Sequence, residues 1–248
     1  MRRFDSPGRE VHLWAVRLSA QEQGLARALS WLSPDEAARA ERFRLDKHRR
    51  AFALGRAALR KLVSGYLGLV PTEVSFVYGP KGKPALAGPA QSLRFNASNS
   101  GDLAVYAFAE GCELGVDVEH RRPVPEIGRI ADRFFAREEA AELMALPEAE
   151  RTQGFFNCWT RKEAYIKAVG GGLSVPLDSF RVTLGSGAQL LCVAGSAEAA
   201  RGWTMHGFRP APGYTGALAY PDQPRRLVAK PLLTASDLME RWVWDNKE

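Results

Sequence analysis

The sequence presents the same order of segments twice, and this order limits the folds that the chain can adopt. In each half, stretches with apolar residues at helical spacing precede short strand-like stretches that are separated by turn residues. Helices grouped before strands, rather than alternating with them, are typical of α+β domains with antiparallel sheets. We therefore expect an α+β fold with two similar lobes, each built from helices packed on an antiparallel sheet.

The boundary between the lobes is expected at Glu110-Gly111-Cys112, which lies between two strand-like stretches. This division gives an N-terminal lobe over residues 1–110, a C-terminal lobe over 111–226 and a tail over 227–248. The clearest single element is a helix over 46–67, which Gly68 ends. In the tail, residues 237–244 are expected to form one short helix that packs its tryptophans on the body.

Composition narrows the class of partner. The 248 residues carry a net charge of +6 with a pI of about 9.4, which favours an anionic partner such as a nucleotide, an acidic protein or nucleic acid. A basic surface without a specific partner is the alternative. No helix-turn-helix, RNP-like strand or zinc-finger pattern supports nucleic-acid binding. The three scattered cysteines indicate reduced thiols in a cytoplasmic protein, and no apolar run approaches membrane-spanning length.

Two short acidic motifs are candidates for a functional site. Asp117 and Glu119 lie two apart on an expected strand, so both side chains share one face. They are either the solvated face of an edge strand or a pair that a cation neutralises. Glu163 and Lys167 lie four apart on an expected helix and are neighbours on one face. An ordinary surface ion pair is the alternative for this second motif.

Lysine is scarce in this chain, with eight residues among 34 basic ones, so its placement draws notice. Lys162 and Lys167 lie on either side of Glu163 in the sequence, and Lys83 lies in the turn Gly82-Lys83-Pro84. Three hard carboxylate ligands suit a magnesium ion, and ammonium groups beside them suit the phosphates of a nucleotide. Together these residues indicate a site that moves a phosphorylated group. For Lys83 alone, an exposed lysine in a hairpin turn is the alternative.

Taken jointly, several segments resemble the Sfp-type 4′-phosphopantetheinyl transferases. The resemblance rests on Gly115-Val-Asp-Val-Glu119, Arg133-Phe134-Phe135, Trp159-Thr-Arg-Lys-Glu-Ala-Tyr-Ile-Lys167 and Gly172-Leu-Ser-Val-Pro-Leu-Asp-Ser-Phe180. Upstream, Ser33-Pro34, Arg42-Phe43, Gly82-Lys83-Pro84 and Phe95-Asn96-Ala97-Ser98 add to it. The likeness runs in register from Leu32 to Phe180, and the order and spacing of so many pieces make it specific.

The resemblance implies two pseudo-symmetric lobes, in a pseudo-two-fold arrangement, with coenzyme A in the cleft between them. It implies transfer of the phosphopantetheine arm to a serine of an apo carrier protein, with release of 3′,5′-ADP. By position, Asp117, Glu119 and Glu163 look like the magnesium ligands, and Glu163 also like the group that takes the serine proton. Lys162 and Lys167 look like phosphate-facing lysines, and Lys167 also like the residue that stabilises the departing ADP.

The nucleotide end of coenzyme A is expected at Lys83 and Ser98. This chain departs from the family pattern at Asn99, where a histidine usually follows the serine; an amide still donates hydrogen bonds but carries no charge. The arginine that the family places near the start of the long helix is assigned to Arg50, although Ala51 falls where some members carry it.

The implied partner is an acidic apo acyl carrier or peptidyl carrier protein, and the net positive charge fits it. A basic stretch is expected to form either a docking patch or a solvated helical face, and it comprises Arg39, Arg42, Arg44, Arg49, Arg50 and Arg56. Phe134 and Phe135 are either part of the docking surface or part of the core. The rival function is a catalytically weak coenzyme A or nucleotide-binding module. We expect a monomer, because the cleft is formed within one chain.

Overall fold

A computed structural model describes residues 4–88, 92–221 and 224–240 of the chain. The first half contains β1 (Glu10–Arg17), α1 (Glu22–Ser30), α2 (Pro34–Glu41), α3 (Asp46–Leu67), β2 (Phe76–Tyr78), β3 (Pro84–Leu86), β4 (Leu93–Ser100) and β5 (Leu103–Glu110). The second half contains β6 (Gly115–His120), α4 (Ile127–Phe134), α5 (Arg137–Ala145), α6 (Glu148–Val169), β7 (Phe180–Val182), β8 (Leu190–Val193), β9 (Trp203–Phe208) and β10 (Tyr214–Pro221). The final elements are β11 (Arg226–Ala229), β12 (Leu233–Thr234) and α7 (Ala235–Glu240).

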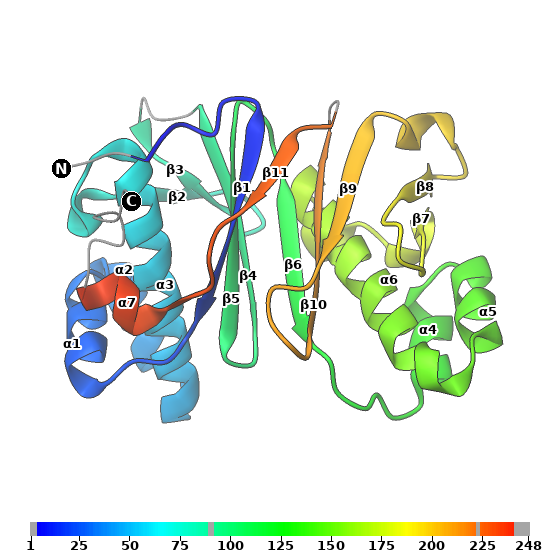
Figure 1. The fold of residues 1–248 in the computed structure, drawn as a ribbon, viewed down its shortest axis with the longest axis horizontal. Helices are drawn as coiled ribbons and strands as arrows, with labels where there is room; N and C mark the ends of the chain where they lie inside the picture. The colour runs from blue at the N-terminus through cyan, green and yellow to red at the C-terminus, as the bar shows by residue number, and fades with distance from the viewer. Residues whose placement is uncertain (1–3, 89–91, 222–223, 241–248) are drawn as a thin grey trace.

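Two sheets face each other in the middle of the molecule, and helices cover both outer sides (Figure 1). One sheet has the order β11-β1-β5-β4, with β12 also paired to β1, and the other has the order β6-β10-β9. Apolar side chains fill three layers: between the first sheet and its helices, between the two sheets, and between the second sheet and α6. The expected α+β class with two lobes is therefore confirmed.

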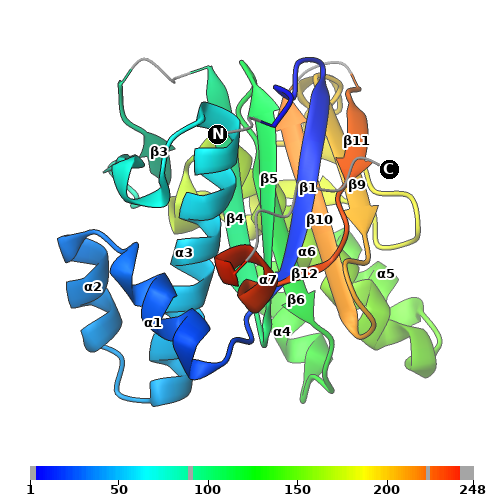
Figure 2. The ribbon, with the colours of Figure 1, turned by 60° about the vertical axis from the view of Figure 1, so that its left-hand side comes forward.

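The sheets are antiparallel apart from one edge of the first. Strands β11 and β12, which come last in the chain, pair with β1 in parallel. Helix α7 follows them and lies beside α3 (Figure 2). Its Leu238 and Met239 are buried in the core of the first lobe. The C-terminal segment thus packs on the lobe that the N-terminal half builds. The expected helix over 237–244 corresponds to α7 as far as Glu240, and its tryptophans lie outside the described residues.

Helix ends follow local chemistry. Helix α3 spans the expected residues and ends at Gly68, whose φ of 70° is left-handed and suits glycine. At the start of α2, the Ser33 N–H donates to Glu36 at 3.0 Å. Glu36 is almost fully buried and pairs with Arg60 at 2.6 Å, which fixes α2 on α3. None of the helices in the described ranges combines the length and the apolar character needed to span a bilayer.

The two sheets meet edge to edge where β4 approaches β6. Within the described ranges, no strand pairs with β6 on this side. A side chain of β4 binds its backbone instead, because the Val116 N–H donates to Asn96 Oδ1 at 2.9 Å. The polar composition of Ser98 to Gly101 is typical of a turn, but β4 continues to Ser100 and pairs with β5 over its whole length. Because side chains alternate along a strand, Asn96, Ser98 and Ser100 share one face of β4.

Gly115, at the start of β6, allows this strand to lie directly on α6. A Cβ atom at this position would stand 2.1 Å from the carbonyl oxygen of Ala164 and 2.4 Å from the amide nitrogen of Ala168. Both are backbone atoms of a helix and cannot move independently. The strand and the helix can therefore approach this closely only with glycine here.

We expect Gly115→Ala to lower the free energy of unfolding by at least about 1–3 kcal/mol, the usual cost of overpacking a rigid site. Chemical denaturation measures this change. Gly187→Ala is the control, because a Cβ atom there meets nothing within 4 Å. Equal stability of the two variants would show that β6 does not depend on this contact.

Candidate active site

Strand β6 carries two carboxylates on one face and two valines on the other. Val116 and Val118 are buried in the layer between the sheets. Asp117, buried, and Glu119, half-buried, therefore lie on the opposite face of the strand, where α6 packs. The alternating pattern in the sequence thus separates a core face from a polar face.

Helix α6 brings Glu163 and Lys167 to the same place from the other side. The Lys167 ammonium lies 2.7 Å from Asp117 Oδ1 and donates to Ser98 Oγ at 3.0 Å and to the carbonyl of Val116 at 3.3 Å. Glu163 lies one helical turn earlier and forms no hydrogen bond with a described residue. The structure therefore joins Asp117, Glu163, Lys167 and Ser98, which are expected site residues from three separate segments.

The three carboxylates are close enough to perturb one another. Burial raises the pKa of Glu163, and the negative charges of Asp117 and then Glu119 raise it further, whereas Lys167 opposes the rise. Burial also raises the pKa of Glu119; the Ser100 hydroxyl opposes this rise and Asp117 adds to it. Negative charge is thus concentrated where a cation would relieve it.

Carboxylate oxygens that accept no hydrogen bond are the atoms of this cluster that could bind a divalent cation. Asp117 Oδ2 is buried and has no hydrogen-bond partner in the part of the chain that the structure describes. Among the described residues, Glu119 uses only Oε2 in its contacts. Hard oxygen donors left free in an acidic cluster suit magnesium. In the described ranges, however, no three His, Cys, Asp or Glu side chains already stand close enough to form a ligand set. The donor types therefore fit magnesium without forming a closed cage.

A cavity of about 260 Å³ adjoins this cluster on the side of the first lobe. Its lining comprises Arg39, Ala51, Phe52, Gly55, Arg56, Leu59, Gly82, Pro84, Ala97, Ser98, Asn99, Ala104 and Tyr106. The guanidinium carbons of Arg39 and Arg56 stand 5.2 and 5.9 Å from the centre of the Phe52 ring. Arg56 Nε lies 3.4 Å from the buried carboxylate of Glu36, and Arg56 Nη1 is buried without a hydrogen-bond partner among the described residues. The cavity therefore offers an aromatic face and two arginine side chains, and Ser98 connects it to Asp117.

A second cavity, of about 300 Å³, lies at the other end of the carboxylate cluster. Glu119 and Arg122 line it together with apolar residues, which are Pro123, Val124, Pro125, Ile130, Phe155, Phe156 and Trp159. Trp159 precedes Glu163 by one turn on α6, so the same face of this helix borders the carboxylates and the apolar cavity. The cluster therefore lies between a cationic cavity and an apolar one.

Two of the expected site residues, Lys162 and Arg50, lie away from the carboxylate cluster in the structure. Lys162 is fully buried; its ammonium pairs with Glu139 at 2.7 Å and donates to the carbonyls of Leu177 and Phe180. It faces the core because it lies about 100° around α6 from Glu163. Arg50 pairs with Glu22 and points away from the cationic cavity, whereas its neighbour Ala51 lines that cavity.

The other expected residues lie in or near the cationic cavity, at the junction of the lobes, or in the core of the second lobe. Asn99 lines the cationic cavity. Lys83 does not line it: its ammonium pairs with Glu113 at 3.0 Å and donates to the carbonyl of Lys167 at 2.9 Å, so it ties the first lobe to the end of α6. Phe135 is core, and Phe134 is about one-third exposed against Trp159.

Two residues of the site, Arg56 and Ser100, have no separate role in the sequence analysis. Arg56 appeared only within a basic stretch, and its position on the cavity depends on how α3 packs. Ser100 lies in a stretch of turn-like composition, and its spacing of two residues from Ser98 is the signal that places it on the same strand face.

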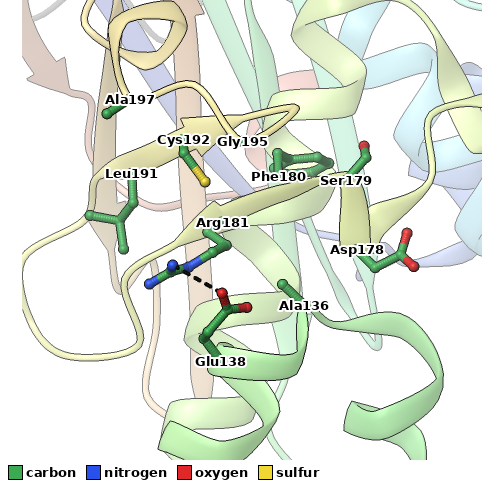
Figure 3. A pocket seen from close by; sticks show the side chains of 10 residues that line it. All are labelled: Ala136, Glu138, Asp178, Ser179, Phe180, Arg181, Leu191, Cys192, Gly195 and Ala197. Atoms are coloured by element: carbon green, nitrogen blue, oxygen red, sulfur yellow. Dashed lines mark hydrogen bonds and ion pairs between the residues drawn. The ribbon is translucent and has the colours of Figure 1, made fainter.

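A roomier cavity, of about 570 Å³, lies apart from these residues (Figure 3). It is bordered by the start of α5 and by β7 and β8, where Arg181 reaches Glu138 at 3.4 Å. Cys192 also lines it. No carboxylate of the cluster borders this cavity, so its volume does not identify it as the reaction site.

The fold and the site define a two-lobed α+β protein with an acidic cluster between a cationic and an apolar cavity. Comparison with known proteins assigns this architecture to a family. Residues 17–111 match the family model of the 4′-phosphopantetheinyl transferase N-terminal domain, and residues 113–219 match that of the 4′-phosphopantetheinyl transferase superfamily.

Three relatives carry the same description. The 4′-phosphopantetheinyl transferase HetI of Nostoc sp. is 41% identical over 71% of this chain and 74% of its own length. A putative 4′-phosphopantetheinyl transferase of Synechocystis sp., slr0495, is 38% identical over 59% and 60%. The 4′-phosphopantetheinyl transferase Sfp of Bacillus subtilis is 34% identical over 69% and 75%. The chain belongs to the Sfp-type 4′-phosphopantetheinyl transferases, and it is an enzyme that transfers 4′-phosphopantetheine from coenzyme A to carrier proteins.

We expect Lys162→Met to lower the free energy of unfolding by about 3–5 kcal/mol, because it leaves the Glu139 carboxylate buried without its partner. Denaturant titration measures this loss. A lysine that contacts the substrate's phosphates would behave differently: its replacement would raise the KM for coenzyme A and leave the unfolding free energy unchanged. That result would restore Lys162 to the site.

Proposed function

We propose that this enzyme transfers the 4′-phosphopantetheine arm of coenzyme A to a serine of an acidic apo acyl or peptidyl carrier protein, with magnesium, and releases 3′,5′-ADP. The observation that carries the proposal is the junction at Ser98. Its hydroxyl donates to Asp117 at 2.8 Å, accepts from Lys167 and borders the cationic cavity. A nucleotide bound in this cavity therefore has its phosphates beside the carboxylates and Lys167.

The cationic cavity, the carboxylate cluster and the apolar cavity differ in polarity, and this difference sets the orientation in which coenzyme A binds. The cationic cavity suits the 3′-phosphoadenosine end, with the adenine against Phe52 and the 3′-phosphate near Arg39 and Arg56. The carboxylate cluster receives the diphosphate. The apolar cavity beyond Glu119 suits the pantetheine arm.

The metal would be held by Asp117, Glu119 and Glu163. When bound, it neutralises charge on the diphosphate and on the leaving phosphate. The chain's own groups then perform the transfer. Glu163 takes the proton from the carrier serine; its carboxylate lies beside Asp117 and Lys167 and forms no hydrogen bond with a described residue.

The serine oxygen forms a bond to the β-phosphorus of coenzyme A, and the bond from that phosphorus to the oxygen bridging the two phosphates breaks. The arm stays with the serine as a phosphodiester, and 3′,5′-ADP leaves with the bridging oxygen. Lys167 stabilises the negative charge that develops on this oxygen, because its ammonium already lies in the site.

The carrier is proposed to dock on the basic end of the first lobe. Arg39, Arg42 and Arg44 are exposed there, beside Phe43 at 37% and Leu45 at 54% exposure. An acidic helix with apolar side chains complements such a surface in charge and in polarity. We also propose a monomer and a lobe boundary at residues 110 and 111, since one chain supplies all the residues of the site.

The proposal is tested by mass spectrometry of several apo carriers incubated with the enzyme, coenzyme A and magnesium. We expect one added arm on the reactive serine. Asp117→Ala should slow transfer by about 1,000-fold, the equivalent of several kcal/mol of lost charge stabilisation, while the protein stays folded. Coenzyme A binding without transfer by the unmodified chain would favour the binding-module alternative, and full activity of Asp117→Ala would remove the metal assignment.

We expect Arg56→Gln to lower kcat/KM for coenzyme A by about 10- to 100-fold, because one charge-assisted phosphate contact contributes about 1.5–3 kcal/mol. The value for dephospho-coenzyme A, which lacks the 3′-phosphate, should change little. Arg50→Gln is the control, since Arg50 points away from the cavity. Equal losses with both substrates would show that Arg56 does not recognise the 3′-phosphate.

A further inference from the structure

Two serines of the first lobe hold the two carboxylates of β6 in the same manner. Ser98 Oγ donates to Asp117 Oδ1 at 2.8 Å, and Ser100 Oγ donates to Glu119 Oε2 at 2.6 Å. In each carboxylate the other oxygen has no hydrogen-bond partner among the described residues. Ser98 and Ser100, two residues apart on β4, thus bind Asp117 and Glu119, two residues apart on β6.

The direction of the Ser100 hydroxyl is itself fixed. The His120 N–H, at the end of β6, donates to Ser100 Oγ at 3.1 Å. A hydroxyl oxygen that accepts this bond can still donate its proton, and Glu119 Oε2 lies within reach. The backbone of β6 therefore orients a side chain of β4, which in turn orients a side chain of β6.

We propose that Ser100 is a positioning residue for Glu119, so that the first lobe sets the geometry of a metal site whose ligands all belong to the second. This inference rests on the proposed function and deepens it. By occupying Oε2, Ser100 restricts the rotation of the Glu119 carboxylate and leaves Oε1 to the cation. Ser98 acts on Asp117 in the same way, together with Lys167. Partners of this kind typically change metal affinity by about 10- to 100-fold.

A purely structural role for Ser100 makes a different prediction. Ser100 lies at the end of β4 and is half-buried, and β4 is already paired with β5 up to this residue. Loss of a hydroxyl that only joined the two strands would lower thermal stability and leave metal affinity unchanged. Metal affinity therefore separates the two roles.

The matched pair Ser100→Thr and Ser100→Val isolates the hydroxyl, because the two side chains have nearly the same shape and both suit a strand. Binding of Mn²⁺ to the full chain with coenzyme A present, followed by electron paramagnetic resonance, gives the metal affinity directly. We expect the Mn²⁺ Kd of Ser100→Val to rise about 10- to 100-fold and that of Ser100→Thr to stay near the unmodified value. Ser30→Ala removes an exposed hydroxyl that only caps a carbonyl of α1, and it should change nothing.

Transfer kinetics supply the second readout. In Ser100→Val the Mg²⁺ concentration for half-maximal rate should rise by the same factor, with kcat at saturating Mg²⁺ within about twofold of the unmodified enzyme. If Ser100→Val binds Mn²⁺ as tightly as Ser100→Thr while the unmodified enzyme is active, the positioning role is wrong and the proposed function stands. If the unmodified enzyme neither binds Mn²⁺ nor needs Mg²⁺, the metal assignment fails and this inference fails with it.

Discussion

The contact of β6 with α6 is the constraint on which the site depends. At Gly115 the strand lies so close to the backbone of the helix that a Cβ atom would not fit between them. From this contact, one step of two residues along the strand reaches Asp117. One helical turn separates Lys167 from Glu163. The functional groups therefore lie within the first few residues of a fixed junction, where backbone position varies least.

Gathering three carboxylates at such a junction costs stability. Burial and mutual repulsion raise the pKa values of Glu119 and Glu163, so their ionised forms are disfavoured in the folded chain. Lys167 offsets part of this repulsion through its contact with Asp117. Under the proposed function, a substrate and a cation would use this acidic cluster, and groups at active sites commonly trade stability for function in this way.

Local patterns in the sequence were sufficient to predict most helices and strands and to place Asp117 and Glu119 on one face of a strand. Helix α3 has its own stop signal in Gly68, and the alternation of Val116, Asp117, Val118 and Glu119 defines two faces without reference to the rest of the chain. Features that depend on contacts between distant parts of the chain could not be predicted from these local patterns. The parallel pairing of β11 with β1 joins opposite ends of the chain, and the turn-like composition of Ser98 to Gly101 concealed a strand that β5 extends by pairing.

Lys162 and Arg50 lie away from the carboxylate cluster for a common reason, which also explains how the rotation of α6 about its axis is fixed. Neighbouring residues on a helix point about 100° apart, so a sequence motif cannot state which of them faces the site until the rotation of the helix is known. In α6 that rotation is fixed by Lys162, which Glu139 and two carbonyl oxygens hold inside the second lobe. A buried ion pair adds little net stability over an apolar contact, but it is satisfied in only one orientation. We therefore interpret the Lys162–Glu139 pair as the contact that turns Glu163 and Lys167 towards β6, so that a lysine buried away from the chemistry still determines where the chemistry occurs.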